Sequence, residues 1–195
     1  LIGAGGTGSC MMDELFRLHA LLTRLDHPGL RVRVWDGDTV SEANVGRQRF
    51  WPCDVGWNKA ELLCQRYNSF GGTDWEFESR FLQAAACRQI RPDLLISCVD
   101  DPKVRVMLAK AGRKQSDPDA LWIDTGNDAN SGQVILGHWS GWTSKANKLP
   151  NVFDLYPSLK GQESHLEPSC STEEAVTRQA FGINQRIDAE ASGFK

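Results

Sequence analysis

The residues best suited to chemistry begin at position 3, where Gly3-Ala4-Gly5-Gly6-Thr7-Gly8 has the spacing G-x-G-x-x-G. This segment follows the apolar pair Leu1-Ile2 and precedes a stretch with helical periodicity. In such a motif the glycines permit a tight turn, a close approach of backbone to phosphate, and close helix packing. The helix N-terminus then offers N–H groups to an anion, although the spacing also fits a glycine turn that binds nothing. The glycines predicted to bind a nucleotide are Gly3, Gly5, Gly6 and Gly8.

An acidic residue, Asp36, ends the run Leu30–Asp36, whose alternating apolar residues predict a strand. An acid at this point of a nucleotide-binding βαβ unit can accept hydrogen bonds from ribose hydroxyls. We therefore expect Asp36 to bind the nucleotide, with a turn carboxylate that binds no ligand as the alternative.

Further landmarks follow in a fixed order. Residues 36–48 read DGDTVSEANVGRQ, Lys59 comes next, and Cys98-Val99-Asp100 ends an apolar run. With the glycine loop, these segments resemble the ThiF/MoeB family and the adenylation domains of ubiquitin-activating enzymes. The pattern of that family is D-x-D-x-V-x-x-S-N-x-x-R-Q, a lysine, and then C-x-D. The resemblance covers residues 1–137 and continues more weakly to 185.

A narrower resemblance depends on Asp124–Asn127, Gly132–Val134 and Pro168–Ser171. These segments are similar to the ThiF-related proteins of the bacterial ParB-related, ThiF-related cassette (PRTRC). The chain departs from the wider family in two respects, because it lacks C-x-x-C zinc pairs and carries Asp101 where asparagine is frequent.

The resemblance implies an ATP-dependent adenylyltransferase. Such an enzyme converts the C-terminal carboxylate of a ubiquitin-like or sulfur-carrier-like protein into an acyl-adenylate and releases pyrophosphate. Because two anions are brought together, positive groups must absorb the charge of the transition state. Arg47 and Lys59 are the candidate cations and Asp100 is the candidate Mg²⁺ ligand. The other residues expected to bind ATP are Asp38, Asn44 and Gln48.

These assignments have simpler alternatives. Arg47 and Lys59 could be solvated surface charges. Asn44 and Gln48 could serve only to fold a polar loop.

Cys170 is a candidate nucleophile. It precedes Ser171 and Glu174, whose spacing predicts a capping box, and a helix N-terminus lowers the pKa of a nearby thiol. In relatives that form a thioester, a cysteine after the adenylation core accepts the activated carboxyl group. An incidental loop cysteine is the alternative, and the sequence leaves both open.

The elements that position these residues alternate between strands and helices, as in a βαβ fold. Periodicity predicts helices over Cys10–Leu25 and Pro102–Gly112, and a third helix is predicted over Asn58–Phe70. Asn58 and Glu61 have the spacing of an N-cap residue with its reciprocal acid. Strands are predicted at Leu1-Ile2, Leu30–Asp36, Trp75–Arg80, Leu94–Val99, Leu121–Thr125 and Gln133–Leu136. We therefore expect an α/β fold of the ThiF/MoeB adenylation type, with a Rossmann-like, mainly parallel sheet and helices on both faces.

The expected organisation is a single adenylation domain over residues 1–185. Its nucleotide-binding core spans 1–137, and the loop-rich segment 138–170, expected to be irregular, follows. The terminal part, 171–195, is predicted to contain a helix over 172–182.

Composition excludes several classes of protein. Hydrophobic residues make up 41% and charged residues 24% of the 195, which is typical of a globular protein. The net charge of −3 argues against nucleic-acid binding, and no apolar run reaches the roughly 20 residues of a membrane helix. Six cysteines without a C-x-x-C pair argue against structural zinc and favour the reducing cytoplasm. The resemblance to MoeB-like proteins implies a homodimer.

Two other functions remain as alternatives. The glycine loop and Asp36 also fit an NAD-dependent oxidoreductase, but that function leaves Arg47, Lys59 and Asp100 unexplained and offers no evident acid or base for hydride transfer. A catalytically silent binding module is expected to lose one of these three residues, and none is lost. Adenylation is therefore the favoured hypothesis.

Overall fold

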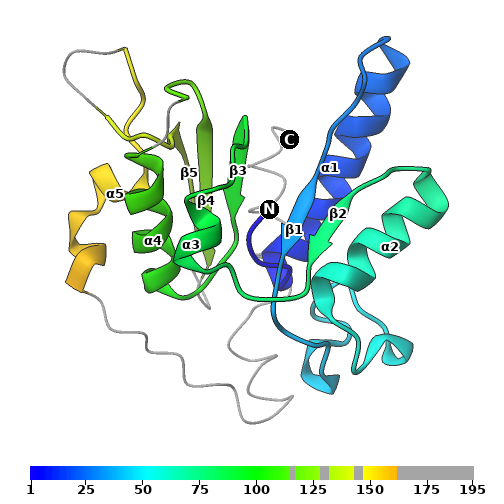
Figure 1. Ribbon diagram of the computed structural model, residues 1–195. Coiled ribbons are helices and arrows are strands. Elements are labelled where there is room, and N and C mark those ends of the chain that lie inside the picture. Colours follow the sequence, from blue (N-terminus) through cyan, green and yellow to red (C-terminus); the bar gives the residue numbers. More distant parts are fainter. Residues whose placement is uncertain (115–116, 128–131, 143–146, 162–195) are drawn as a thin grey trace.

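The computed structural model describes residues 1–114, 117–127, 132–142 and 147–161 (Figure 1). Its strands are β1 (Arg33–Trp35), β2 (Glu76–Glu78), β3 (Leu94–Ser97), β4 (Leu121–Asn127) and β5 (Gly132–His138). Its α-helices are α1 (Gly6–Arg24), α2 (Lys59–Gly71), α3 (Ala84–Cys87), α4 (Pro102–Gly112) and α5 (Val152–Leu155). Short 3-10 helices span Glu42–Asn44, Pro52–Asp54 and Pro157–Gly161. None of the helices in the described ranges is long and apolar enough to cross a membrane.

A single residue, Ile2, joins the two halves of the sheet. It pairs in parallel with Trp35 of β1 on one side and with Ser97 of β3 on the other. The Ile2 N–H donates to the carbonyl oxygen of Ile96 at 2.8 Å, and the Trp35 N–H donates to that of Leu1 at 2.9 Å. β2 is parallel to β1 and β4 is parallel to β3, whereas β5 is antiparallel to β4. The order is therefore β2-β1-Ile2-β3-β4-β5, which is mainly parallel, as predicted.

Helices cover both faces of this sheet, with α1 and α2 on one face and α3, α4 and α5 on the other (Figure 1). Successive side chains of a strand point to opposite faces, so adjacent residues of β1 belong to different cores. Val34 packs in a cluster that includes Met12 of α1 and Leu63 of α2. Trp35 packs in a second cluster that includes Leu108 of α4. This arrangement confirms the predicted Rossmann-like α/β class.

The helices differ from the prediction in three places. α3 lies between two predicted strands, where no element was predicted. α1 begins at Gly6 rather than at Cys10, because the end of the glycine loop itself forms the first helical turn. The segment expected to be irregular contains α5, since the Asn151 side chain accepts hydrogen bonds from the N–H groups of Phe153 and Asp154 and so starts a helix there. The helix predicted over 172–182 lies outside the described residues.

The start of α2 is hydrogen-bonded to the turn that follows β1. Asn58 is the N-cap residue, and its Oδ1 accepts the N–H of Glu61 at 3.0 Å, as the sequence predicts. Its Nδ2 also donates to the carbonyl oxygens of Asp36 and Asp38, at 2.9 and 3.0 Å. One side chain therefore starts the helix and fixes the backbone of the Asp36–Asp38 turn.

We expect Asn58→Ala to lower the free energy of unfolding by about 1–2 kcal/mol, because it removes both the cap and these links. Chemical denaturation measures this change. Gln65→Ala in the same helix removes only an exposed hydrogen bond to Glu61 and should stay within about 0.5 kcal/mol of wild type. Equal effects of the two substitutions would contradict the role given to Asn58.

Candidate active site

The glycine loop leaves the sheet between the ends of β1 and β3. Gly3 has a φ of +91°, and a Cβ on it would lie 2.6 Å from the carbonyl oxygen of Cys98, so only glycine fits there. A Cβ on Gly8 would collide with the carbonyl oxygen of Gly3. At Gly5, by contrast, no heavy atom of the described chain lies within 4 Å of an added Cβ. The loop is thus tightly packed at its ends and open at Gly5, as the approach of a phosphate requires.

Asp36 follows β1 directly and is tied to the glycine loop. Its Oδ2 accepts the N–H of Ala4 at 2.6 Å, and its Oδ1 accepts the N–H of Asp38 at 2.8 Å. Burial raises the pKa of this carboxyl, while the two N–H groups and Lys59 act in the opposite direction. Because a carboxylate has about four lone-pair sites, Asp36 keeps acceptor capacity for a ribose hydroxyl.

Lys59 is the first residue of α2 and only 6% of its surface is exposed. Its Nζ lies 3.4 Å from Oδ2 of Asp38, which is itself exposed. Its charge also lowers the pKa of Asp36 and of Asp100. A cation at a helix N-terminus is disfavoured by the helix dipole, so these carboxylates stabilise the charge of Lys59. The charge of Lys59 therefore acts on Asp36, which follows β1, and on Asp100, which lies beyond β3.

Asn44 folds the loop that carries Arg47. Its Oδ1 accepts the N–H and the hydroxyl of Ser41 at 2.9 and 3.1 Å, and the residue is buried. The oxygen of Asn44 is therefore engaged within the protein, and binding of ATP by Asn44 stays a prediction.

Gln48 lies in the same loop, and its Oε1 is buried without a hydrogen-bond partner in the described structure. The loop reaches α1 here, since the Arg49 N–H donates to Ser9 Oγ at 3.2 Å. A buried acceptor without a donor is costly. A ligand that supplies a hydrogen-bond donor would satisfy Gln48 and would be stabilised by it.

Arg47 and Asp100 act on each other across the site. Arg47 is half-buried, and its Nε donates to the carbonyl oxygen of Ala43 at 3.3 Å. Burial lowers the pKa of this guanidinium, whereas the charge of Asp100 raises it. The structure therefore brings the 41–50 loop and the segment after β3 within electrostatic reach of one another.

Asp100 lies three residues beyond the end of β3, and its side chain is accessible to solvent. Among the residues that the structure describes, none forms a hydrogen bond or ion pair with its carboxylate. Desolvation by the surrounding protein raises its pKa, whereas Arg105, Arg47 and Lys59 lower it. Three cations thus act on one available carboxylate, which suits a ligand of phosphate-bound Mg²⁺.

An ion pair between Arg105 and Asp124, which was not predicted from the sequence, contacts the main chain of Asp100. The two residues are 7% and 1% exposed, and the Arg105 Nε lies 3.0 Å from both carboxylate oxygens of Asp124. Burial raises the pKa of Asp124, and Arg105 and the Ser97 hydroxyl oppose that effect. The sequence carries one signal for this pair, since Asp124 is an acid inside a predicted strand. A buried charge requires a partner, so such an acid indicates a nearby cation.

Other predicted features are not placed in the site. Cys170 lies outside the described residues. In the described part of the chain no cysteine forms a disulfide, and no group of three or more His, Cys, Asp or Glu could hold a metal ion. A Mg²⁺ ion held by nucleotide phosphates needs only one or two carboxylates, so Asp100 alone is compatible with that role.

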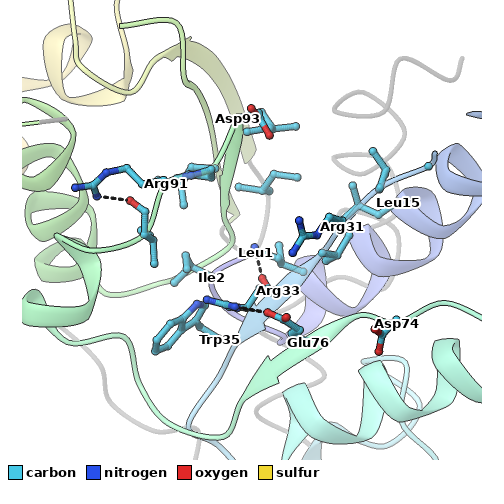
Figure 2. Close-up of a pocket in the computed structure, with 18 of the residues that line it drawn as sticks. Leu1, Ile2, Leu15, Arg31, Arg33, Trp35, Asp74, Glu76, Arg91 and Asp93 are labelled. Carbon is cyan, nitrogen blue, oxygen red and sulfur yellow. Dashed lines mark hydrogen bonds and ion pairs between the residues drawn. The ribbon is translucent and has the colours of Figure 1, made fainter. Parts of the chain in front are cut away.

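A cavity of about 640 Å³ lies elsewhere, at the amino ends of the strands (Figure 2). It is lined by Leu1, Arg33 of β1, Glu76 of β2, and Arg91 and Asp93 before β3. The glycine loop, Asp36 and Asp100 follow the carboxyl ends of the same strands, where open α/β sheets bind ligands. The cavity is therefore distinct from the candidate active site.

Comparison with known proteins gives both a family and a fold. The sequence profile of the ThiF family matches residues 1–182. Ubiquitin-like modifier-activating enzyme 5 from Oryza sativa subsp. japonica is 27% identical over 156 residues, which are 70% of this chain and 34% of that enzyme. The chain therefore spans about a third of this relative.

Solved structures of Escherichia coli MccB have a similar fold. The complex of MccB with AMPCPP and MccA has a TM-score of 0.58 at 14% identity, covering 98% of this chain and 52% of MccB. MccB with ATP has a TM-score of 0.56 at 15% identity, over the same shares of the two chains. The chain thus spans about half of MccB, and at this identity the likeness concerns the fold.

We expect Gly8→Ala to destabilise the protein by about 1–3 kcal/mol, because the new methyl group collides with backbone that cannot move freely. Gly5→Ala is the matched control, since its methyl group enters open space, and it should leave thermal unfolding close to wild type. If Gly8→Ala were equally harmless, the packing described for the loop would be wrong.

Proposed function

The chain belongs to the ThiF family, and on that premise we propose that it is an ATP-dependent adenylyltransferase. The proposed reaction activates a carboxylate as an acyl-adenylate and releases pyrophosphate. The observation that carries this proposal is that the charges of Arg47 and Lys59 act on Asp100, whose segment packs against Gly3 of the glycine loop.

The chemistry explains why these charges are needed together. The substrate carboxylate attacks the α-phosphorus of ATP, and the bond from that phosphorus to the bridging oxygen of pyrophosphate breaks. Both reactants are anions, so their approach needs positive charge that is already in place. Arg47 can hold two phosphate oxygens with its planar guanidinium, and Lys59 supplies a compact charge.

The described residues fit ATP and Mg²⁺ at particular atoms. The open space at Gly5 accommodates a phosphate next to the start of α1. The unpartnered Oε1 of Gln48 can accept a hydrogen bond from the nucleotide, and Asp36 can accept one from a ribose hydroxyl. Asp100 would hold Mg²⁺, which supplies charge neutralisation on the phosphates.

The substrate that we propose is a small ubiquitin-like or sulfur-carrier-like protein whose C-terminal carboxylate enters the site. The rice relative, named as an activating enzyme for a ubiquitin-like modifier, supports this choice. We further propose that the protein is a homodimer of the cytoplasm. Its membership of the PRTRC cassette and a thioester on Cys170 remain predictions from the sequence.

The test is radiolabelled pyrophosphate exchange into ATP, with and without candidate ubiquitin-like proteins. Asp100→Asn and Arg47→Ala should each reduce exchange by about 10²-fold or more, because each removes charge that stabilises the transition state. Both variants should retain cooperative thermal unfolding.

Neighbouring residues give matched controls for these variants. Asp101→Asn keeps the cap of α4, since asparagine also caps helices. Arg49→Ala removes a partly exposed pair with Asp13 and a side-chain hydrogen bond with Cys10. Both controls should exchange pyrophosphate at close to the wild-type rate. Near-normal exchange in Asp100→Asn and Arg47→Ala would place the catalytic centre elsewhere.

Nucleotide selectivity separates adenylation from hydride transfer. We expect Mg²⁺–ATP to bind at least about tenfold more tightly than NAD, a difference of about 1.4 kcal/mol, because Lys59 and Arg47 match a triphosphate. Lys59→Gln should weaken ATP binding, and Lys110→Gln, an exposed lysine of α4, should not. Calorimetry measures both. Tight NAD binding without ATP binding would favour an oxidoreductase instead.

A further inference from the structure

Arg105 contacts two segments: strand β4 and the residues beyond β3 that carry Asp100. On β4 its Nε lies 3.0 Å from both carboxylate oxygens of Asp124, and its Nη2 donates to the carbonyl oxygen of Thr125 at 3.0 Å. Beyond β3, its Nη1 donates to the carbonyl oxygen of Asp100 at 3.4 Å. Each nitrogen of the guanidinium thus has a protein acceptor.

The acceptors are themselves fixed. The Ser97 hydroxyl donates to Asp124 Oδ1 at 2.6 Å and accepts the indole N–H of Trp122 at 2.8 Å. The Thr125 hydroxyl donates to the carbonyl oxygen of Ser97 at 3.1 Å. Because Ser97 and Asp124 are register partners in the parallel pair β3–β4, this network gives Arg105 one defined position.

The contact with Asp100 is made through its main chain, not its side chain. The carboxylate of Asp100 forms no hydrogen bond or ion pair with any residue in the described ranges, so its direction follows from the backbone that carries it. That backbone is held before Asp100, where the Cys98 N–H donates to the Ile2 carbonyl oxygen at 2.8 Å. It is held after Asp100 by the cap that Asp101 makes on the N–H of Lys103.

Stability alone does not account for a buried ion pair at this place. Such pairs are often no better than apolar residues of similar volume. Arginine differs from lysine because its planar fork can reach three acceptors at once in a fixed geometry. Several contacts in a fixed geometry are needed to hold a loop against a strand, and arginine can supply them.

We propose that Arg105 is a positioning residue for Asp100: anchored on Asp124, it holds the backbone beyond β3 so that the Asp100 carboxylate faces the metal–phosphate site. The inference rests on the proposed function, because it assigns Asp100 to Mg²⁺. It goes beyond that function by adding a residue that is not expected to touch ATP or the substrate carboxylate.

The test measures binding directly, apart from turnover. Calorimetry gives the Kd of ATP with and without Mg²⁺, and the ratio of the two is the magnesium gain. Arg105→Lys should reduce this gain by about tenfold or more, since residues that orient metal ligands typically have such effects. The Kd without Mg²⁺ should stay close to wild type. Arg113→Lys is the control, because Arg113 is the C-cap residue of the same helix and pairs with Asp154 at 3.4 Å.

A double variant separates positioning from general stability. If Arg105 acts through Asp100, then Asp100→Asn combined with Arg105→Lys should have the magnesium gain of Asp100→Asn alone. Should Arg105→Lys fail to unfold cooperatively, Ser97→Ala carries the test, because it loosens Asp124 without removing a charge. It should lower the gain in the same direction but by less.

The outcomes are distinct. The proposal is supported if Arg105→Lys loses the magnesium gain, Arg113→Lys keeps it, and the double variant loses no more than Asp100→Asn alone. A wild-type gain in Arg105→Lys, or in Ser97→Ala where that variant carries the test, overturns it and leaves the proposed function standing. If Arg105→Lys weakened ATP binding both with and without Mg²⁺, and its loss added to that of Asp100→Asn in the double variant, Arg105 would be merely structural. That result would also overturn the proposal. A wild-type protein that binds no ATP overturns the proposed function and this inference with it.

Discussion

The pairing of Ile2 with two strands at once is the constraint on which the rest of the site depends. Because Ile2 is bonded to both β1 and β3, the glycine loop must leave the sheet between Asp36, which follows β1, and Asp100, which lies beyond β3. The crossover helices also change sides at this point, since α1 and α2 cover one face and α4 covers the other (Figure 1). A switch of this kind is where open α/β sheets bind ligands. The position of the candidate site therefore follows from strand order.

Charge in this site is arranged before any ligand arrives. Lys59 is buried at the positive end of α2, a placement that the helix dipole disfavours and that nearby carboxylates offset. Arg47 is half-buried, and that burial lowers its pKa. Cations that are already desolvated and fixed need little reorganisation when an anion reacts beside them. In a protein that bound no anion at this place, the same burial would only lower stability, because desolvating a charge is unfavourable.

The sequence predicted the parts of the structure that local patterns determine. The glycine spacing, the acid after an apolar run and the cap at Asn58 each lie within a few residues, and the structure places all three at one edge of the sheet. The exact start of α1 and the helix α5 were not predicted, because glycines and an isolated cap at Asn151 are also common in loops. The helix α3 was not predicted either, because its four residues are too few to show a helical period. The pair of Arg105 with Asp124 could not be predicted, since it depends on the register of β3 with β4. The contact of Ser41 with Asn44 Oδ1 is local and has capping-box spacing, but the sequence does not decide whether that oxygen binds Ser41 or a ligand.

A common principle connects the residues that hold the site together: their side chains bind main-chain groups. Asp36 accepts the N–H of Ala4, Asn58 donates to the carbonyl oxygens of Asp36 and Asp38, and Arg105 donates to those of Asp100 and Thr125. Fixing a residue by its backbone leaves its own side chain available, which a bond between side chains would not. Asp100 is the clearest case, because its main chain is held on both sides while its carboxylate keeps its acceptor sites for an incoming cation. A fold that fixes its loops in this way can be rigid and still present reactive groups, the combination that electrostatic catalysis requires.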